Sequence, residues 1–317
     1  MTIVSIAGRL LAAFLLVLTA FPSSAQEGKR IALSFDDVPR EAGGFMTPDQ
    51  RTIALIAGLH EAGVEQAGFF VTTGNLEKDD GKGGEARIRA YVAAGHVIGN
   101  HSHSHGWLWN GDVAAYIADL DRAEAWLADK PGKRPWYRFP YLDEGRDPAR
   151  RDALRAALRE RGLSNAYVTV DNYDWAIDGL ATKAVREGRA LDRGALRDFY
   201  VETVVDTAEF NDRIARETLG RSPAHVLLLH ETDLNGLFIV DLVKGLRAAG
   251  WTIIPIDAAY RDPIAALEPD TVYLGGGRVA ALANVAGRNP ASLVHERTDE
   301  AELARLFEER VVVRSRP

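Results

Sequence analysis

The sequence of 317 residues contains no cysteine. Disulfide bonds and thiolate ligands are therefore excluded, so any metal ion must be held by nitrogen and oxygen atoms. The sequence also lacks an excess of basic residues, since 38 Lys and Arg stand against 45 Asp and Glu and the net charge is −7. This balance argues against binding to nucleic acid or to an anionic membrane. A content of 46% hydrophobic and 26% charged residues is typical of a globular chain with one large α/β domain or two small ones.

The apolar segment at the amino terminus is too short to span a bilayer comfortably. It covers residues 10–21, follows Arg9 and precedes the small residues Ser23, Ser24 and Ala25. A basic residue, an apolar run and small residues in this order are typical of a secretory signal peptide. We therefore expect residues 1–25 to be removed from a bacterial protein that is periplasmic or secreted and has no stable membrane anchor. The alternative is a buried amino-terminal helix of an intracellular protein.

After residue 28, short β-branched or aromatic runs alternate with longer amphipathic segments. Strands are expected at 30–35, 67–71, 96–100, 136–140, 166–170, 225–229 and 251–256. Helical periodicity predicts helices at 48–62, 86–94, 113–128, 147–161 and 237–248. This alternation predicts an α/β fold, a distorted (β/α) barrel of about seven parallel strands with its site at their carboxyl ends.

Two regions interrupt the alternation. Residues 176–224 form a long insertion, in which we expect a helix over 195–219 that ends at Gly220 and either covers a rim of the site or packs peripherally. Residues 260–317 form a C-terminal extension that is expected to pack on the barrel. Its glycine triplet at 275–277 is expected to be a flexible turn rather than a phosphate-binding loop, because no Lys-Ser/Thr pair follows. A last helix is expected with Thr298 as its N-cap.

Polar side chains follow several expected strands. Asp36 and Asp37 follow the first strand, and the segment HSHSH at 101–105 follows the third. Two imidazoles and a carboxylate can hold a divalent metal ion with a position open for water, and a second carboxylate can act as a base. Taken alone, the aspartate pair could be a helix cap or a solvated loop, and the HSHSH segment could be a solvated loop. Their shared position favours a hydrolytic metal site, with ligands that suit zinc and, as alternatives, cobalt, nickel, manganese or iron.

The HSHSH segment allows two ligand geometries. In an extended strand His101, His103 and His105 would share one face, giving a three-histidine site without Asp37. In a turn, residues four apart meet and His103 points away. The two serines and the glycine that follows favour the turn.

Five short motifs, in this order, resemble those of the polysaccharide deacetylase family, which shares the NodB homology domain (carbohydrate esterase family 4). They are SFDDVP at 34–39, HSHSH at 101–105, RFPY at 138–141, DNYDW at 171–175 and LLLH at 227–230. The resemblance implies a NodB-like domain at 28–259. The family's glycine after the aspartate pair is Val38 here, so either the loop runs differently or this position needs no positive φ. We interpret the difference as variation within the family, because the side chains that carry chemistry are present.

The resemblance also implies roles for the residues that match the first three motifs. The divalent metal ion would be held by Asp37, His101 and His105. Asp36 would be the general base that takes a proton from the attacking water, and Arg138 would orient it. The backbone N–H of Tyr141 would help to hold the oxyanion.

The last two motifs imply the other half of the site. His230 would protonate the departing amine, and Asp174 would fix the tautomer of its ring. Trp175 and Leu228 would wall the acetyl pocket. Trp107 and Trp109, just after the histidines, could stack on sugar rings or be ordinary packing residues.

These roles imply a metal-dependent hydrolase that removes N-acetyl groups from a carbohydrate, a chitooligosaccharide or a peptidoglycan-type aminosugar. Its partner would be the acetylated carbohydrate, while the oligomeric state has no signal in the sequence. Two alternatives use the same side chains: an esterase for O-acetyl xylan and a hydrolase for a small cyclic amide. A third is a catalytically silent, sugar-binding relative.

Overall fold

The computed structural model describes residues 28–108, 111–273 and 275–313. The expected signal segment and Trp109 lie outside these described residues. Within them, no helix combines the length and the apolar character that a bilayer crossing requires.

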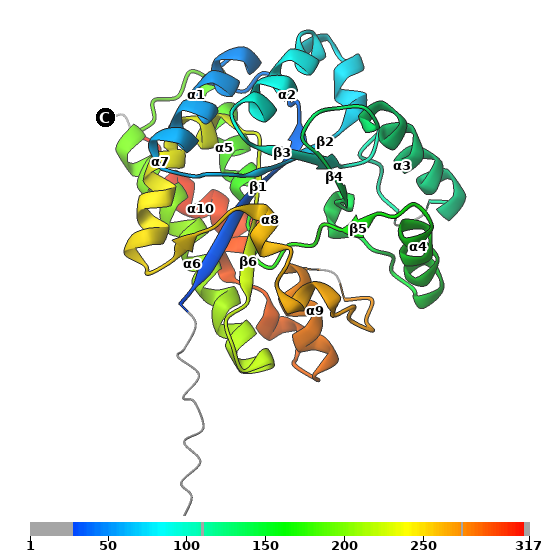
Figure 1. Ribbon diagram of the computed structural model, residues 1–317. Helices are drawn as coiled ribbons and strands as arrows, with labels where there is room; N and C mark the ends of the chain where they lie inside the picture. Colours follow the sequence, from blue (N-terminus) through cyan, green and yellow to red (C-terminus); the bar gives the residue numbers. More distant parts are fainter. Residues whose placement is uncertain (1–27, 109–110, 274, 314–317) are drawn as a thin grey trace, which may run out of the picture.

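A curled sheet of seven parallel strands forms the centre of the described structure (Figure 1). The order along the sheet is β5-β4-β3-β2-β1-β6, and β7 also pairs with β1. The strands are β1 (Arg30–Val38), β2 (Gly68–Val71), β3 (Val97–Asn100), β4 (Lys133–Tyr137), β5 (Ser164–Asn165), β6 (Ala224–His230) and β7 (Thr252–Ile253). The predicted α/β fold is confirmed. Because parallel strands point the same way, the residues that follow them gather at one edge of the half-barrel.

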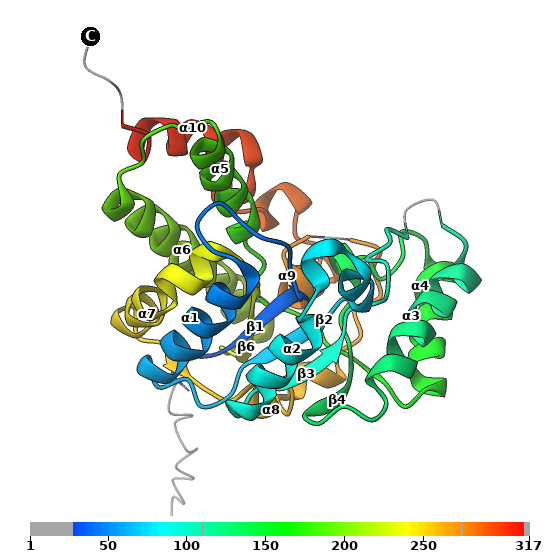
Figure 2. The same ribbon diagram turned by 90° about the horizontal axis from the view of Figure 1, so that it is seen from above.

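Helices surround this sheet, as the view from above shows (Figure 2). They are α1 (Pro48–Glu61), α2 (Gly84–Ala93), α3 (Val113–Leu127), α4 (Pro148–Glu160), α5 (Asp174–Arg186), α6 (Arg193–Leu219), α7 (Asp233–Ala248), α8 (Ile256–Ala259), α9 (Gly277–Val285) and α10 (Glu300–Arg310). Local sequence sets many of the starts. Thr47 and Gln50 form a reciprocal capping box at α1, and Asp147 caps α4 before a proline.

The strands bury their two faces in two different cores. In β6, Leu227 and Leu229 lie in a core with α1, α5, α6 and α7, whereas Val226 and Leu228 lie in a second core with α8 and α9. Side chains of a strand alternate between faces. The same alternation in β1 keeps Asp36 off the first core, on the face toward which the site residues point.

The strand expected at 166–170 is wrong. The N–H groups of Thr169 and Val170 both donate to the carbonyl of Val226, and the Thr169 hydroxyl accepts from the Val226 N–H at 2.8 Å. The hydroxyl and the shared carbonyl replace the partners of a regular ladder, so only an isolated bridge from Val170 to Leu227 forms. In addition, β4 covers 133–137 instead of the expected 136–140.

The C-terminal residues correct one further expectation and refine another. Asp299, not Thr298, caps α10, because its carboxylate accepts from the Glu302 N–H. The glycine triplet forms the expected turn, but the turn is closely packed and leads into α9, with Gly275 and Gly276 before the helix and Gly277 as its first residue. Gly277 has a φ of 74°, and a Cβ on it would lie 2.5 Å from the Val168 carbonyl oxygen. Helix α9 packs on α6, and α10 packs on α5 and α6.

The long insertion contains the helix expected there. Helix α6 covers Arg193–Leu219, and its C-cap residue Gly220 adopts a left-handed φ of 71°. That conformation suits glycine at a helix end. The helix packs against α7 on one side and α9 on the other.

Candidate active site

The aspartate pair lies at the end of β1. Asp37 adopts a left-handed φ of 67°, which redirects its side chain relative to the strand. Val38 is still part of β1, fully buried and paired with Val71. The positive φ therefore falls on Asp37, one residue before Val38. A valine at position 38 fits because extended backbone and burial both suit a β-branched side chain.

The histidine segment is a turn and not an extended strand. Ser102 and His105 have φ values of 69° and 55°. The Ser102 N–H donates to the Asn100 side chain at 2.7 Å, and the His105 N–H donates to the Ser102 hydroxyl at 2.9 Å. His103 points away, with its Nδ1 2.9 Å from the Thr73 hydroxyl.

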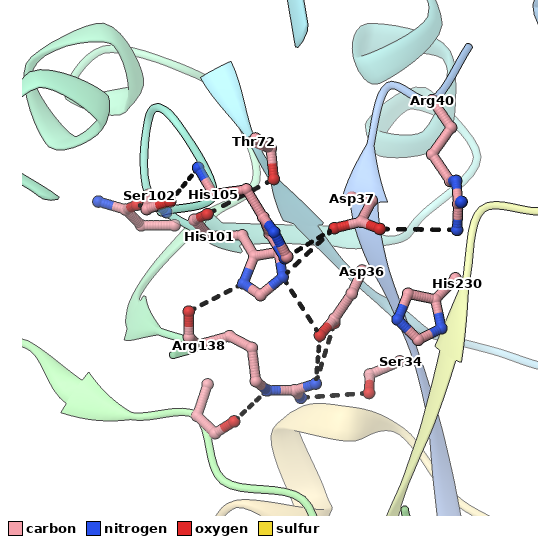
Figure 3. Close-up of polar contacts among 12 residues, drawn as sticks. Ser34, Asp36, Asp37, Arg40, Thr72, His101, Ser102, His105, Arg138 and His230 are labelled. Atoms are coloured by element: carbon pink, nitrogen blue, oxygen red, sulfur yellow. Dashed lines mark hydrogen bonds and ion pairs between the residues drawn. The ribbon is translucent and has the colours of Figure 1, made fainter. Parts of the chain in front are cut away.

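This turn brings His101 and His105 to Asp37 (Figure 3). Their Nε2 atoms lie 3.6 and 3.2 Å from Asp37 Oδ1, and one ligand atom from each of the three residues lies within 4.8 Å of the others. His101 Nδ1 is 2.8 Å from the Arg138 carbonyl, which fixes the tautomer and leaves the Nε2 lone pair toward Asp37. Two imidazoles and one carboxylate are a donor set that fits a zinc-like divalent ion.

The charges of these groups suit metal binding. Burial lowers the pKa of both His101 and His105 to about 4, so both rings are neutral at neutral pH. Burial alone would raise the pKa of Asp37, but His230, His105 and Arg40 outweigh it and hold that pKa well below its ordinary value. An ionised carboxylate beside two neutral imidazoles is the protonation state in which these groups bind metal ions.

Asp36 lies beside this cluster and is held by Arg138. The Arg138 Nη1 lies 2.9 Å from Oδ1 of Asp36 and 3.1 Å from Oδ2. Arg138 is fully buried, and its Nη2 donates to the hydroxyls of Ser34 and Tyr260. Burial raises the pKa of Asp36 to about 6, although Arg138 opposes this shift. Asp36 is therefore a fixed carboxylate with a pKa close to the range that general bases use.

His230 stands on the other side of the aspartate pair (Figure 3). Its Nδ1 lies 2.7 Å from Asp174 Oδ1, and its backbone N–H donates to Asp174 Oδ2 at 2.8 Å. Asn235 donates to the same Oδ2 at 2.8 Å. Burial lowers the pKa of His230, but Asp174 outweighs it and raises the value to about 9. This imidazole is therefore cationic at neutral pH and can give up a proton.

The remaining expected residues lie around this centre. Tyr141 has a φ of 56° in the 3₁₀ turn Pro140–Leu142, and its ring contacts those of His105 and Trp107 at centroid distances of 4.7 and 5.3 Å. Trp175 is partly exposed at the start of α5, and Leu228 is buried on the same face of β6 as His230. Trp107 and Tyr141 together form an exposed aromatic edge next to the histidines.

Apart from Ser34, the residues that contact the central ones lie outside the motifs of the sequence. Ser34 and Tyr260 position Arg138, Asn235 positions Asp174, and Arg40 lies 3.5 Å from Asp37. Arg40 was the only one with a usable signal, because it directly follows the aspartate motif. The others are ordinary polar residues that acquire a partner only through the fold.

A second missed group fixes the chain just after the aspartate pair. Asp233 accepts from the N–H groups of Phe45 and Met46 and pairs with Arg51 at 3.0 Å, with both side chains buried. Arg51 also donates to the carbonyls of residues 40 and 41. This buried ion pair ties the segment 40–46 to the start of α7, close to His230.

Comparison with known proteins supports the resemblance over the first half of the chain. A family model described as polysaccharide deacetylase matches residues 23–164, which contain the first three motifs. No curated protein sequence matches the chain. Residues 23–164 match the polysaccharide deacetylase family, and the resemblance seen in the motifs is confirmed over that part of the chain.

Several solved structures are similar to this chain. A family 4 carbohydrate esterase from Streptomyces lividans, in complex with acetate, is 21% identical with a TM-score of 0.47, covering 72% of this chain and 93% of its own. A mutant of a family 4 pseudoenzyme from Bacillus anthracis is 15% identical with a TM-score of 0.52, covering 74% and 68%. Peptidoglycan deacetylase PdaC from Bacillus subtilis is 20% identical with a TM-score of 0.46, covering 74% and 90%. At these identities the likeness concerns the fold.

Proposed function

We propose that this protein is a metal-dependent hydrolase that removes N-acetyl groups from an aminosugar carbohydrate. The proposal rests on one observation: a set of metal-ligand residues and a charged His–Asp pair lie on either side of Asp36. On one side lies the ligand set of Asp37, His101 and His105, and on the other lies the ion pair of His230 and Asp174. Export through the amino-terminal segment is part of the proposal and rests on the sequence alone.

In this proposal Asp37, His101 and His105 hold the divalent ion. When bound, such an ion lowers the pKa of water and stabilises negative charge on a carbonyl oxygen. The chain supplies the rest of the chemistry. Asp36, held in place by the buried Arg138, accepts the proton of the attacking water.

The other half of the reaction concerns the leaving group. An amine leaves poorly as an anion, so it needs a proton as the carbon–nitrogen bond breaks. The His230 ring is cationic because Asp174 stabilises its charge, and it stands across the aspartate pair from the two ligand histidines. It donates its proton to the departing nitrogen, and the backbone N–H of Tyr141 supports the oxyanion.

The test is acetate release from N-acetylglucosamine oligomers by the purified protein after chelation, with and without added Zn²⁺. Acetylated xylan and a small cyclic amide serve as competing substrates. We expect acetate release that depends on added metal and is faster from the aminosugar. Faster turnover of either competing substrate would assign the site to the corresponding ester or cyclic amide. No turnover of any of them above the metal-free control would identify a silent binding relative.

A further inference from the structure

The exposed tryptophan, tyrosine and phenylalanine side chains of this protein gather at the candidate site. Within residues 28–108, 111–273 and 275–313, the exposed ones are Trp107, Tyr141 and Trp175, with exposed fractions of 53%, 56% and 36%. The proposed reaction uses the backbone N–H of Tyr141 but assigns nothing to its ring or to Trp107. Aromatic residues are mostly covered in folded proteins, so their exposure at one place indicates a surface that meets a ligand.

Trp107 is held outward by a loop whose neighbouring residues are fixed. The next residue, Leu108, is buried and packs in a small core with Phe139. On the other side of Trp107, the backbone N–H of His103 donates to the carboxylate of Asp119 at 2.9 Å. The exposure decides between the two roles expected for Trp107, stacking and packing. The indole is not an ordinary packing residue, because Leu108 fills that role and more than half of the indole stays exposed.

Tyr141 is turned outward by an unusual backbone. It and Leu142 have φ values of 56° and 53°, in the left-handed region that residues other than glycine rarely adopt. Leu142 is partly buried, whereas the centroid of the Tyr141 ring lies 4.7 Å from that of His105 and 5.3 Å from that of Trp107. Backbone strain of this kind is common at ligand-binding sites. The two rings form an aromatic edge, Trp107 and Tyr141, that begins at a ligand histidine of the candidate metal site.

A cation borders the aromatic edge. The Arg146 guanidinium lies over the Trp107 ring, 5.1 Å from its centre, and its Nε is 3.6 Å from a carboxylate oxygen of Asp143. The guanidinium covers part of the indole, and more than half of the side chain remains exposed. The rings of Trp107 and Tyr141 are inclined by 37°, and at 5.3 Å they are close enough for one ligand ring to touch both. Guanidinium hydrogens and the tyrosine hydroxyl surround this contact with polar groups.

An aromatic edge with polar groups around it suits a sugar ring. The C–H face of a pyranose packs against aromatic rings, and its hydroxyls find donors and acceptors beside them. A protein partner would call for a larger apolar patch. The other exposed large apolar side chains of the described residues lie on other segments: Ile53, Leu267, Val272, Val285, Val294 and Val313. None of them belongs to the loops that carry the aromatic edge, so the edge has the size of one sugar unit.

The position of the aromatic edge defines which sugar unit it meets. The reacting acetyl group must lie between the candidate metal ligands and Asp36, and His230 stands across the aspartate pair from His105 (Figure 3). The edge begins at His105, so it lies on the metal side, outward from the reacting unit. A sugar chain over the centre therefore reaches the edge with a neighbouring unit, whereas a single sugar bound for reaction does not.

We propose that the aromatic edge of Trp107 and Tyr141 binds the sugar unit next to the one that loses its acetyl group. The protein then acts on a unit within a chain rather than on a single sugar. That the ligand is a sugar rests on the proposed function, whereas the exposure of the edge and its place beside His105 do not. Trp107 thus sets the preference for a chain and touches no reacting atom.

The first test compares acetate release from an N-acetylglucosamine tetramer and from N-acetylglucosamine itself, with Zn²⁺ added. Trp107→Ala should raise KM for the tetramer roughly tenfold, because the stacking contact is lost, and should change kcat less than about twofold. The preference for the tetramer, as a ratio of kcat/KM values, should shrink by the same factor. Trp107→Phe keeps an aromatic face and should stay within about threefold of the wild type. Ile53→Ala, which removes an exposed apolar side chain from α1, is the matched control and should change neither constant.

The second test measures binding without reaction, by calorimetric titration of the Zn²⁺-loaded protein with cellotetraose. This is a similar sugar chain that has no acetyl group to lose. Its affinity should fall roughly threefold or more in Trp107→Ala and stay unchanged in Ile53→Ala. The unfolding midpoint of Trp107→Ala should equal that of the wild type, because the removed ring is mostly exposed.

Unchanged KM for the tetramer together with unchanged affinity for cellotetraose in Trp107→Ala would overturn the proposal. A loss of kcat without a rise of KM would also overturn it, because Trp107 would then support the ligand histidines instead of a sugar. If no protein releases acetate while cellotetraose binding depends on Trp107, the proposed reaction is wrong and the aromatic edge remains a sugar-binding surface. If the wild type neither releases acetate nor binds cellotetraose, both proposals fail.

Discussion

On the two sides of the site, the pKa of a histidine side chain is shifted in opposite directions. His101 and His105 lie in the turn after β3, where burial lowers their pKa to about 4. His230, at the end of β6, is also enclosed, yet its pKa is raised to about 9. The first pair is neutral and can bind a metal ion, whereas the third is cationic and can donate a proton.

The nearest partner of each ring accounts for this difference. His101 Nδ1 faces a backbone carbonyl, while His230 Nδ1 faces the buried carboxylate of Asp174 at 2.7 Å. His225, also on β6, shows that a carboxylate at a longer distance is insufficient. It lies 3.2 Å from Asp212, and burial still lowers its pKa. In this protein a histidine is cationic at neutral pH when its ring makes a short contact with a buried carboxylate, because that contact raises its pKa.

The largest effect is expected from removing the metal ligands. Alanine at position 37, 101 or 105 should abolish both bound metal and acetate release, because each leaves only two protein ligands. Metal content by mass spectrometry and acetate release are measured on the same samples. His103→Ala is the matched control in the same turn and should keep its metal. Loss of metal in that variant, with retention in His105→Ala, would show that the ligand set is wrong.

Replacing the base should separate rate from metal content. Asp36→Asn should retain the metal and lower kcat by roughly 10²- to 10⁴-fold, since the amide cannot accept a proton. The amide also leaves the buried Arg138 without its carboxylate, so we expect a lower unfolding midpoint. A metal-free Asp36→Asn protein would contradict this assignment and exchange the roles of the two aspartates.

Removing the Asp174 carboxylate should lower the pKa of His230 toward the values of His101 and His105. In Asp174→Asn the pKa of His230 should fall from about 9 toward or below its ordinary value of 6.5. The alkaline decline of kcat should then move to lower pH, which a pH–rate profile and a proton NMR titration of the ring detect. Asp212→Asn, which removes the carboxylate beside His225, should leave that decline in place.

Asp174→Asn should also change how the free energy of unfolding depends on pH. A raised pKa in the folded state stabilises the protein below the unfolded pKa of 6.5, and this contribution is lost as pH rises through about 9. Wild type and Asp174→Asn should therefore differ most in free energy of unfolding below pH 6.5, by about 3 kcal/mol at most. A difference that grows above pH 9 would contradict the ion pair as its source.

The smallest effect concerns Arg40. Its guanidinium lies 3.5 Å from Asp37 and is partly exposed, so it competes weakly with a metal ion for that carboxylate. Arg40→Gln should tighten Zn²⁺ binding by about two- to fivefold, in competition with a chelator of known affinity. Weaker binding in this variant would mean that Arg40 holds Asp37 in place rather than competing for it.

Much of the fold and of the central site could be predicted from local patterns. The short apolar runs of β1 and β6 follow from the burial of both strand faces, and the period of 3.6 in α1, α3, α4 and α7 follows from the burial of one helix face. The segment 166–170 has the same composition as a strand but is not one. A hydroxyl at Thr169 takes the place of a ladder partner, and no periodicity reports such a substitution.

Local patterns are also insufficient to place the end of a helix. Thr298 and Asp299 are both good caps, and only the position of the Glu302 N–H selects the aspartate. The glycine triplet looks like a flexible turn in isolation. In the folded protein Gly277 lies so close to the Val168 carbonyl that a residue with a side chain would clash there.

By itself the sequence determined which chemical groups are present, their order along the chain and the family that their motifs resemble. Those properties are local, because a motif keeps its residue types and spacing whatever surrounds it. The tertiary structure alone decided which histidine is neutral and which is charged, and which polar residues hold Arg138 and Asp174. These properties depend on burial and on the distance between charges, which exist only after the chain has folded.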